Sequence, residues 1–165
     1  MSEQALILDN SVLSALHVSG WFDAPSIYAS DQHILISELV WEHEFTPYHE
    51  RDSIPEWATV KQADLESLQT QALGQLSRAD WSCIALAEQT PATGTVVTND
   101  QALREVATRR DVTAEWGTQF IIRTFKECGI TTSDFERGVD VYLNDVLLPP
   151  NVAEEVRDTE KPSTE

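Results

Sequence analysis

Apolar and polar positions follow two periods along the chain. Short apolar runs typical of buried strands lie at residues 5–8, 33–36, 57–60 and 95–98, with a briefer one near Val112. Elsewhere apolar residues recur every three or four positions, as on one face of a helix. This spacing predicts helices at 11–20, 21–29, 37–45, 64–76, 100–109, 117–128 and 133–147, with one more beginning at Ser77. Strands that alternate with helices favour an α/β fold with a central parallel sheet covered on both sides.

The first strand ends abruptly in a polar turn. Apolar residues 5–8 give way to Asp9, Asn10 and Ser11, after which Val12 and Leu16 resume at helical spacing. In open α/β sheets, ligands bind at the carboxyl ends of the strands, so Asp9 stands where chemistry is expected. Asp and Ser are also favoured helix N-caps. The turn alone does not separate a capping role from a functional one.

Further acidic residues occupy comparable places. The strand at 95–98 is followed by Asn99 and Asp100, so two strands deliver an Asp to one edge of the sheet. Asp80 lies in Ser77-Arg-Ala-Asp80, a pattern typical of a capping box, and capping is compatible with a place in a site. The helix at 37–45 carries Glu38, Glu42 and Glu44, which are either site residues or solvated surface.

Carboxylates held together repel one another, and each would have its pKa raised unless a cation offsets the repulsion. Mg²⁺ and Mn²⁺ prefer oxygen ligands of this kind. Such ions polarise phosphoryl oxygens and help to generate a hydroxide nucleophile. Hydrolysis of a phosphodiester is therefore the reaction class that fits these acids.

The chain is strongly acidic, with 28 Asp and Glu against 11 Lys and Arg and a formal net charge of −17. Such a surface repels itself at low salt and suits a cytoplasm where the Debye length falls to about 3 Å. We therefore expect a halophilic source, an archaeon, although an ordinary acidic protein with a basic partner would have the same composition. The acidity argues against a generic nucleic-acid-binding patch, which needs clustered Lys and Arg. Any contact with nucleic acid should depend on a site helped by cations.

With 165 residues, 41% of them hydrophobic, the chain can form one well-cored domain. We expect this domain to span residues 1–148 and a disordered acidic tail to occupy 149–165, after the break at Pro149-Pro150. The sequence has no apolar run long enough for a membrane span and no basic start typical of a signal peptide, which favours a cytoplasmic protein. Its two cysteines, Cys83 and Cys128, are expected to be reduced.

Three segments resemble, in order and spacing, the signature segments of PIN-domain nucleases. They are Asp9-Asn-Ser-Val-Leu13, Ser77-Arg-Ala-Asp-Trp-Ser-Cys-Ile-Ala-Leu-Ala87 and Val96-Val-Thr-Asn-Asp-Gln-Ala-Leu103. Trp116-Gly-Thr118 is similar to that family's closing segment, so the resemblance covers about residues 5 to 130. It is nearest to the small prokaryotic proteins that include VapC-type toxins. The resemblance implies a PIN-like three-layer αβα fold, an acidic metal pocket, and cleavage of RNA with Mg²⁺ or Mn²⁺.

Position by position, the resemblance places the family acids on Asp9, Asp80 and Asp100, with Ser11, Thr98 and Asn99 as supporting residues. The remaining family acid, a Glu on the helix after the second strand, has no single clear match in this sequence. Its apolar-x-x-Glu-apolar context fits Glu44 best, with Glu42 in reserve, and another register would select His43. We therefore expect Asp9, Glu44, Asp80 and Asp100 to be the catalytic and metal-binding residues.

The resulting hypothesis is a Mg²⁺- or Mn²⁺-dependent endoribonuclease without a covalent intermediate. The resemblance further implies a toxin with an antitoxin partner, and a homodimer. An aspartyl phosphatase would also place an Asp after the first strand, but it needs a second acid where Ser11 stands. A catalytically degenerate PIN-like interaction module is the non-enzymatic alternative. Trp81 and Trp116 are either core residues or stacking partners for RNA bases.

Overall fold

The apolar run after Gln4 forms the central strand of a parallel sheet. The computed structural model describes residues 4–28, 33–49, 53–65, 76–90, 93–145, 148 and 150–159. Strand β1 (Gln4–Leu8) pairs with β2 (His33–Ser37) on one side and β4 (Thr93–Thr98) on the other. Strands β3 (Thr59–Lys61) and β5 (Thr113–Trp116) form the edges, which gives the order β3-β2-β1-β4-β5 with every pairing parallel.

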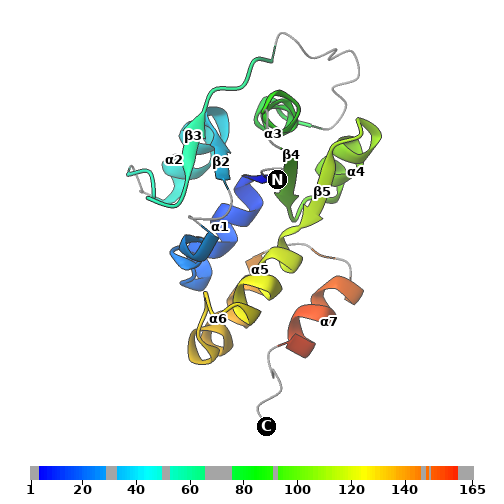
Figure 1. Ribbon diagram of the computed structural model, residues 1–165. Helices are drawn as coiled ribbons and strands as arrows, with labels where there is room; N and C mark the ends of the chain where they lie inside the picture. Colours follow the sequence, from blue (N-terminus) through cyan, green and yellow to red (C-terminus); the bar gives the residue numbers. More distant parts are fainter. Residues whose placement is uncertain are drawn as a thin grey trace.

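Helices cover both faces of this sheet. Helices α3 (Arg78–Gln89) and α4 (Gln101–Arg109) lie on one side, and α1 (Asn10–Ser19), α5 (Gly117–Lys126) and α6 (Thr132–Asp145) lie on the other (Figure 1). The remaining helical elements are the 3₁₀ helix η1 (Ala24–Tyr28), the π-helical segment η2 (Val40–Phe45), α2 (Thr46–His49) and α7 (Pro150–Thr159). The arrangement is the expected PIN-like three-layer αβα fold.

The ends of β1 and β4 lie at the topological switch point of the sheet, where the connections leave in opposite directions. From β1 the chain continues to β2 on one side, whereas from β4 it continues to β5 on the other. Leu8 and Val97 are register partners, so the residues that follow them leave the sheet side by side. In open parallel sheets such a switch point opens a crevice for ligands. The fold therefore brings Asp9 and the turn at Asn99 and Asp100 together.

The strands at the centre are buried on both faces, as expected when helices cover a parallel sheet. Ile7 and Leu8 point to opposite faces of β1, and both are fully buried. The largest buried side chains include Phe45, Phe120, Phe135 and Tyr142. Within the part of the chain that the structure describes, no helix is both long enough and apolar enough to cross a membrane.

Two elements differ in extent from the sequence prediction. Gly94 lies inside β4 rather than before it, and a Cβ there would stand 2.8 Å from backbone atoms of Ala87. The glycine therefore permits the close approach of α3 to the sheet. Residues 21–29 were expected to form a short helix, and the described residues of that range contain the shorter 3₁₀ helix η1. The helix expected at 64–76 falls largely on residues outside the described ranges.

The C-terminal region contains a helix where a disordered tail was expected. Helix α7 begins at Pro150, a residue well suited to a first helical turn. Val152 and Val156, one turn apart, are buried, and Gln119 of α5 donates a 2.8 Å hydrogen bond to Glu155. An apolar pair at helical spacing thus docks a mostly polar segment onto the domain, and the prediction was wrong for residues 150–159.

Candidate metal centre

Asp9 is a buried carboxylate at the carboxyl end of β1, with 3% of its surface exposed. It is the N-cap of α1, and its Oδ2 atom accepts hydrogen bonds from the hydroxyls of Thr98 (2.7 Å) and Ser11 (2.9 Å). Ser11 N–H also approaches Oδ2, at 3.4 Å. The backbone N–H of Asn10 also donates to this carboxylate, so the turn after β1 and the end of β4 together fix its position. Asp9 therefore combines the capping role with a place in a site.

The hydroxyls of Ser11 and Thr98 join the two strand ends. The Ser11 oxygen accepts a 2.9 Å hydrogen bond from the backbone N–H of Asn99, and the Thr98 oxygen accepts one of the same length from Asp100 N–H. Each hydroxyl has a single proton, which it donates to Asp9. The supporting roles expected for Ser11 and Thr98 thus have a direct geometric basis.

Asp80 reaches the same place from α3. Ser77 and Asp80 form the expected capping box: the Ser77 hydroxyl oxygen accepts from Asp80 N–H (3.0 Å), and the Asp80 carboxylate accepts from Ser77 N–H (3.3 Å). This box fixes the first turn of α3 and holds the carboxylate at the sheet edge. Capping and site formation are compatible at Asp80, as they are at Asp9.

Glu44, rather than Glu42, is the acid that η2 contributes. Glu42 and His43 are exposed, whereas Glu44 is half-buried and Phe45 is fully buried. The N–H of Thr46 bonds to the carbonyl of Trp41, an i→i+5 contact that marks a π-helical turn. Such turns contain an extra residue and occur frequently at functional sites. A pattern with 3.6 residues per turn could not fix this register, which explains the ambiguity in the sequence.

One oxygen each from Asp9, Glu44 and Asp80 lies within 4.8 Å of the others. Burial and the charges of Asp9, Asp80 and Asp100 raise the pKa of Glu44 to about 7. Burial and the charge of Asp9 raise the pKa of Asp80 to about 6, although its bonds to Ser77 oppose the shift. Burial likewise raises the pKa of Asp9, against the hydrogen bonds from Thr98 and Ser11.

This carboxylate triad, Asp9, Glu44 and Asp80, fits a divalent metal ion. Three hard oxygen donors converge, and their shared repulsion is the electrostatic strain that a cation relieves. Asp100 lies beside the triad rather than in it. Its Oδ1 caps α4 by accepting from Ala102 N–H (2.9 Å) and Leu103 N–H (3.4 Å). Its charge nevertheless acts on Glu44 and Asp80, so it belongs to the same electrostatic site.

Two residues far along the chain support Asn99, and sequence reasoning did not identify their roles. The Tyr142 hydroxyl of α6 donates to Asn99 Oδ1 at 3.2 Å, and both residues are buried. Gly117 leaves room for the same amide, because a Cβ there would stand 2.6 Å from Asn99 Oδ1. The glycine in Trp116-Gly-Thr118 was a visible signal, whereas a contact across 43 residues has none.

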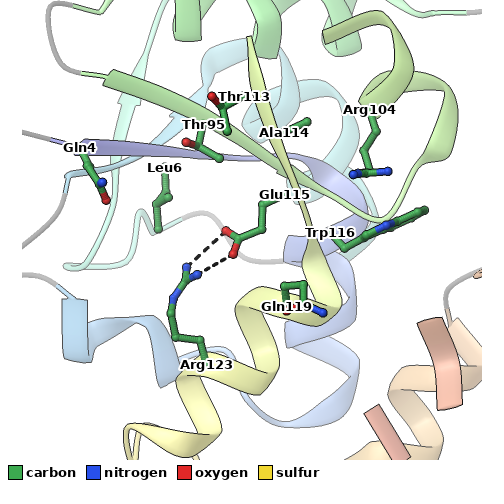
Figure 2. A pocket seen from close by; sticks show the side chains of 10 residues that line it. All are labelled: Gln4, Leu6, Thr95, Arg104, Thr113, Ala114, Glu115, Trp116, Gln119 and Arg123. Carbon is green, nitrogen blue, oxygen red and sulfur yellow. Dashed lines mark hydrogen bonds and ion pairs between the residues drawn. The ribbon is translucent and has the colours of Figure 1, made fainter. Parts of the chain in front are cut away.

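The two tryptophans near the site differ in exposure. Trp81 is a core residue with 5% exposure and has no free face for a base. Trp116 is half-buried, and the guanidinium of Arg104 lies 4.5 Å from its ring centroid. Trp116 and Arg104 line a cavity of about 510 Å³ along edge strand β5, and Figure 2 shows their side chains there. None of the triad residues lines this cavity.

Cys83 and Cys128 are free thiols, as expected.

Comparison with known proteins agrees with this geometry. The DUF3368 family model, described as a PIN domain, matches residues 5–141. No significant match was found among curated proteins or among solved structures. The matched region contains the sheet except for Gln4, together with the triad, Asp100 and the supporting hydroxyls. The chain therefore belongs to the PIN-domain family.

Proposed function

We propose that the protein is a divalent-metal-dependent ribonuclease that hydrolyses RNA phosphodiesters with Mg²⁺ or Mn²⁺. The observation that carries the proposal is the convergence of Asp9, Glu44 and Asp80, which come from three separate segments of the chain. Membership of the PIN-domain family supports the same reaction class. A degenerate interaction module would have no need to keep three mutually repelling carboxylates together.

In this proposal Asp9, Glu44 and Asp80 hold the ion, and each side chain is positioned by its own element. Thr98 and Ser11 donate hydrogen bonds to Asp9 Oδ2 and so fix the position of its carboxylate. The capping box of Ser77 fixes Asp80, and the π-turn of η2 directs Glu44. When bound, the cation polarises the scissile phosphate and promotes ionisation of the attacking water. Asp100 adds negative charge beside the triad and helps retain a cation there.

The test compares two triad variants with a matched variant of an acid outside the triad. We expect Glu44→Gln and Asp9→Asn to lower RNA cleavage in Mn²⁺ and high salt by at least about 100-fold, as losses of transition-state charge stabilisation do. Glu42→Gln removes an exposed acid two residues away and should cleave like wild type. Equal cleavage by all four proteins would refute the proposal, and so would wild-type protein that leaves RNA intact.

The biological setting of the nuclease is a further part of the proposal. A toxin role, a protein antitoxin, a homodimer and a cytoplasmic location rest on the family resemblance and on composition. Co-purification with the product of an adjacent gene, together with growth arrest on expression that Asp9→Asn abolishes, would support the toxin role. Unimpaired growth with active wild-type enzyme would refute it.

A further inference from the structure

A second cavity opens directly beside the metal centre. It has a volume of about 480 Å³ and is lined by Asn10, Ser14, His43, Glu44, Tyr48 and His49. These residues belong to the first half of α1 and to the segment formed by η2 and α2. Glu44 is shared, because it lines the cavity and is a member of the carboxylate triad. A ligand in this cavity would therefore contact the metal centre through Glu44.

The lining residues that the structure describes are polar, and Glu44 is the carboxylate among them. The six lining residues that the structure describes include no Lys or Arg, and the chain as a whole carries a net charge of −17. These six side chains offer a phosphate no Lys or Arg charge, whereas their hydroxyl, amide and imidazole groups suit the polar atoms of a base and a ribose. The volume lies in the range of about 300–1,000 Å³ found for small-ligand sites.

Tyr48 gives the cavity an aromatic surface. Its side chain is 77% exposed, the highest value among the large hydrophobic side chains that the structure describes. Aromatic rings left in water beside an active site offer a stacking face to an unpaired base. Tyr48 is thus placed to stack, in contrast to the buried Trp81.

His49, the residue after Tyr48, joins the two segments that line the cavity. His49 Nε2 and the Ser14 hydroxyl are hydrogen-bonded at 2.9 Å, and this contact joins α2 to α1. The His49 ring also packs against Phe45 (4.9 Å between centroids) and His17 (4.5 Å). Phe45 is fully buried and adjacent to Glu44, so the cavity wall and the triad share one rigid support. A preformed wall lowers the entropy lost when a ligand binds.

We propose that this cavity binds the nucleoside that flanks the phosphate held at the metal centre, with its base stacked on Tyr48. This division of roles rests on the proposed nuclease function: the cation holds the phosphate, and the polar cavity holds the base and ribose. It also accounts for how a chain with so few cations can bind a polyanion.

The test uses adenosine 5′-monophosphate, which has no phosphodiester to cleave, titrated by NMR into the full chain with saturating Mg²⁺. We expect Tyr48→Ala to weaken binding about 5- to 100-fold, in line with the loss of one stacked base. Tyr48→Phe keeps the ring and should bind like wild type, and so should Ile54→Ala, which removes an exposed apolar side chain outside the cavity. Resonances of Ser14 and His49 should shift on binding.

The proposal is overturned if Tyr48→Ala binds the nucleotide as wild type does, or if inorganic phosphate binds as tightly as the nucleotide. Failure of the nuclease function looks different. RNA would then remain intact while the nucleotide still bound in a Tyr48-dependent way. Conversely, cleavage with an unchanged KM in Tyr48→Ala would preserve the nuclease and reject the cavity as a nucleoside site.

Discussion

The hydroxyl of Thr98 donates a 2.7 Å hydrogen bond to Asp9 Oδ2, which links the end of β4 to the end of β1. The same oxygen accepts the N–H of Asp100, so one side chain orients an acid of the triad and the turn that carries its neighbour. This contact lies across the switch point of the sheet. It couples the fold directly to the candidate site.

Removing this hydroxyl should weaken metal binding without removing a ligand. In Thr98→Val, Asp9 loses its shortest hydrogen bond, and the pKa of Asp9 should rise further because that bond favours the ionised form. We expect Mn²⁺ affinity, measured by calorimetry, to fall about 10- to 100-fold, as for other groups that orient metal ligands. Thr98→Ser keeps the donor and should bind Mn²⁺ like wild type. Unchanged affinity in Thr98→Val would mean that the contact is incidental.

Metal-free protein should lose stability as the pH rises. The folded-state pKa of Glu44 is about 7 against an ordinary 4.5, and that of Asp80 is about 6 against 3.8. Both acids release protons more readily when unfolded, so the free energy of unfolding should fall from about pH 4 to pH 7. Denaturant titration in EDTA measures this slope, and Glu44→Gln should flatten it.

Saturating Mn²⁺ should reverse that trend, because the ion binds the deprotonated triad and stabilises the folded state. Apparent Mn²⁺ affinity should accordingly rise with pH between about 5 and 7.5, with release of protons. A pH-independent affinity would show that the triad does not take up the metal.

Salt should stabilise the protein through its surface charge. With a net charge of −17, self-repulsion is strong at about 0.1 M salt and largely screened at about 1 M. We expect the Tm to rise between 0.1 and 2 M KCl, on the scale of those screening lengths. Replacing exposed acids in Glu136→Lys with Glu154→Lys should reduce the rise. A Tm that does not respond to KCl would favour an acidic surface made for a basic partner.

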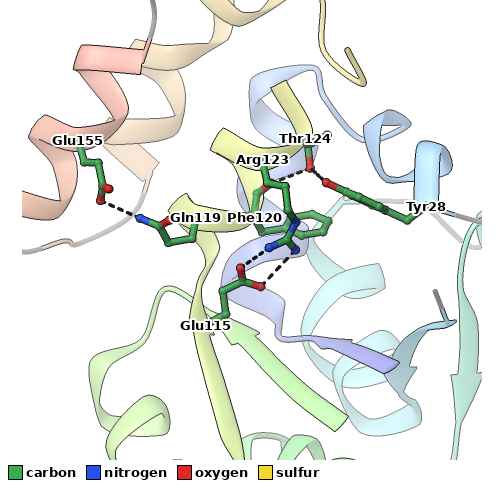
Figure 3. A network of polar contacts seen from close by, with 7 residues as sticks. All are labelled: Tyr28, Glu115, Gln119, Phe120, Arg123, Thr124 and Glu155. Atoms are coloured by element: carbon green, nitrogen blue, oxygen red, sulfur yellow. Dashed lines mark hydrogen bonds and ion pairs between the residues drawn. The ribbon is translucent and has the colours of Figure 1, made fainter. Parts of the chain in front are cut away.

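The Arg123–Glu115 ion pair joins α5 to edge strand β5 and is bidentate, with contacts of 2.5 and 3.3 Å (Figure 3). Beside it, the Thr124 hydroxyl donates to the Phe120 carbonyl, so Tyr28 must donate to Thr124. In a double-mutant cycle with Ala we expect a coupling of about 1 kcal/mol, the upper end for surface pairs.

The exposed pair Arg109–Glu105, at 3.8 Å, is the matched comparison for this cycle and should couple near zero. Both cycles are measured by denaturant unfolding, and Mn²⁺ affinity should remain unchanged throughout. Equal coupling in the two pairs would contradict the importance assigned to bidentate geometry and partial burial.

The sequence located Asp9 and Asp100 at the ends of two strands because a polar residue at the end of an apolar run is a local signal, although Asp100 was expected in the triad and lies beside it. Strand order then placed them together without further information. The place of Asp80 at the start of a helix was also predictable, because its capping box is a four-residue sequence pattern. Glu44 was selected only by its apolar context, because the π-turn of η2 breaks the 3.6-residue period on which such patterns rest.

Features that depend on contacts between distant segments were not predictable in this way. Tyr142 donates a hydrogen bond to Asn99, which lies 43 residues away in the sequence. Gly94 permits close contact between β4 and Ala87 of α3. The docking of α7 had a weak local signal in Val152 and Val156, but the acidic, Pro-flanked composition around them pointed to disorder. Tertiary burial of two valines outweighed that composition.

The central claim is that Asp9, Glu44 and Asp80 form a divalent metal centre. Anomalous X-ray diffraction from crystals grown with Mn²⁺ tests it most directly. We expect an anomalous peak about 2.0–2.2 Å from carboxylate oxygens of all three residues, by analogy with Mg²⁺ geometry, and no peak there in Asp9→Asn. The claim would be contradicted if no anomalous peak lay at the triad at saturating Mn²⁺. It would also be contradicted if Mn²⁺ bound away from the triad and its peak persisted in Asp9→Asn.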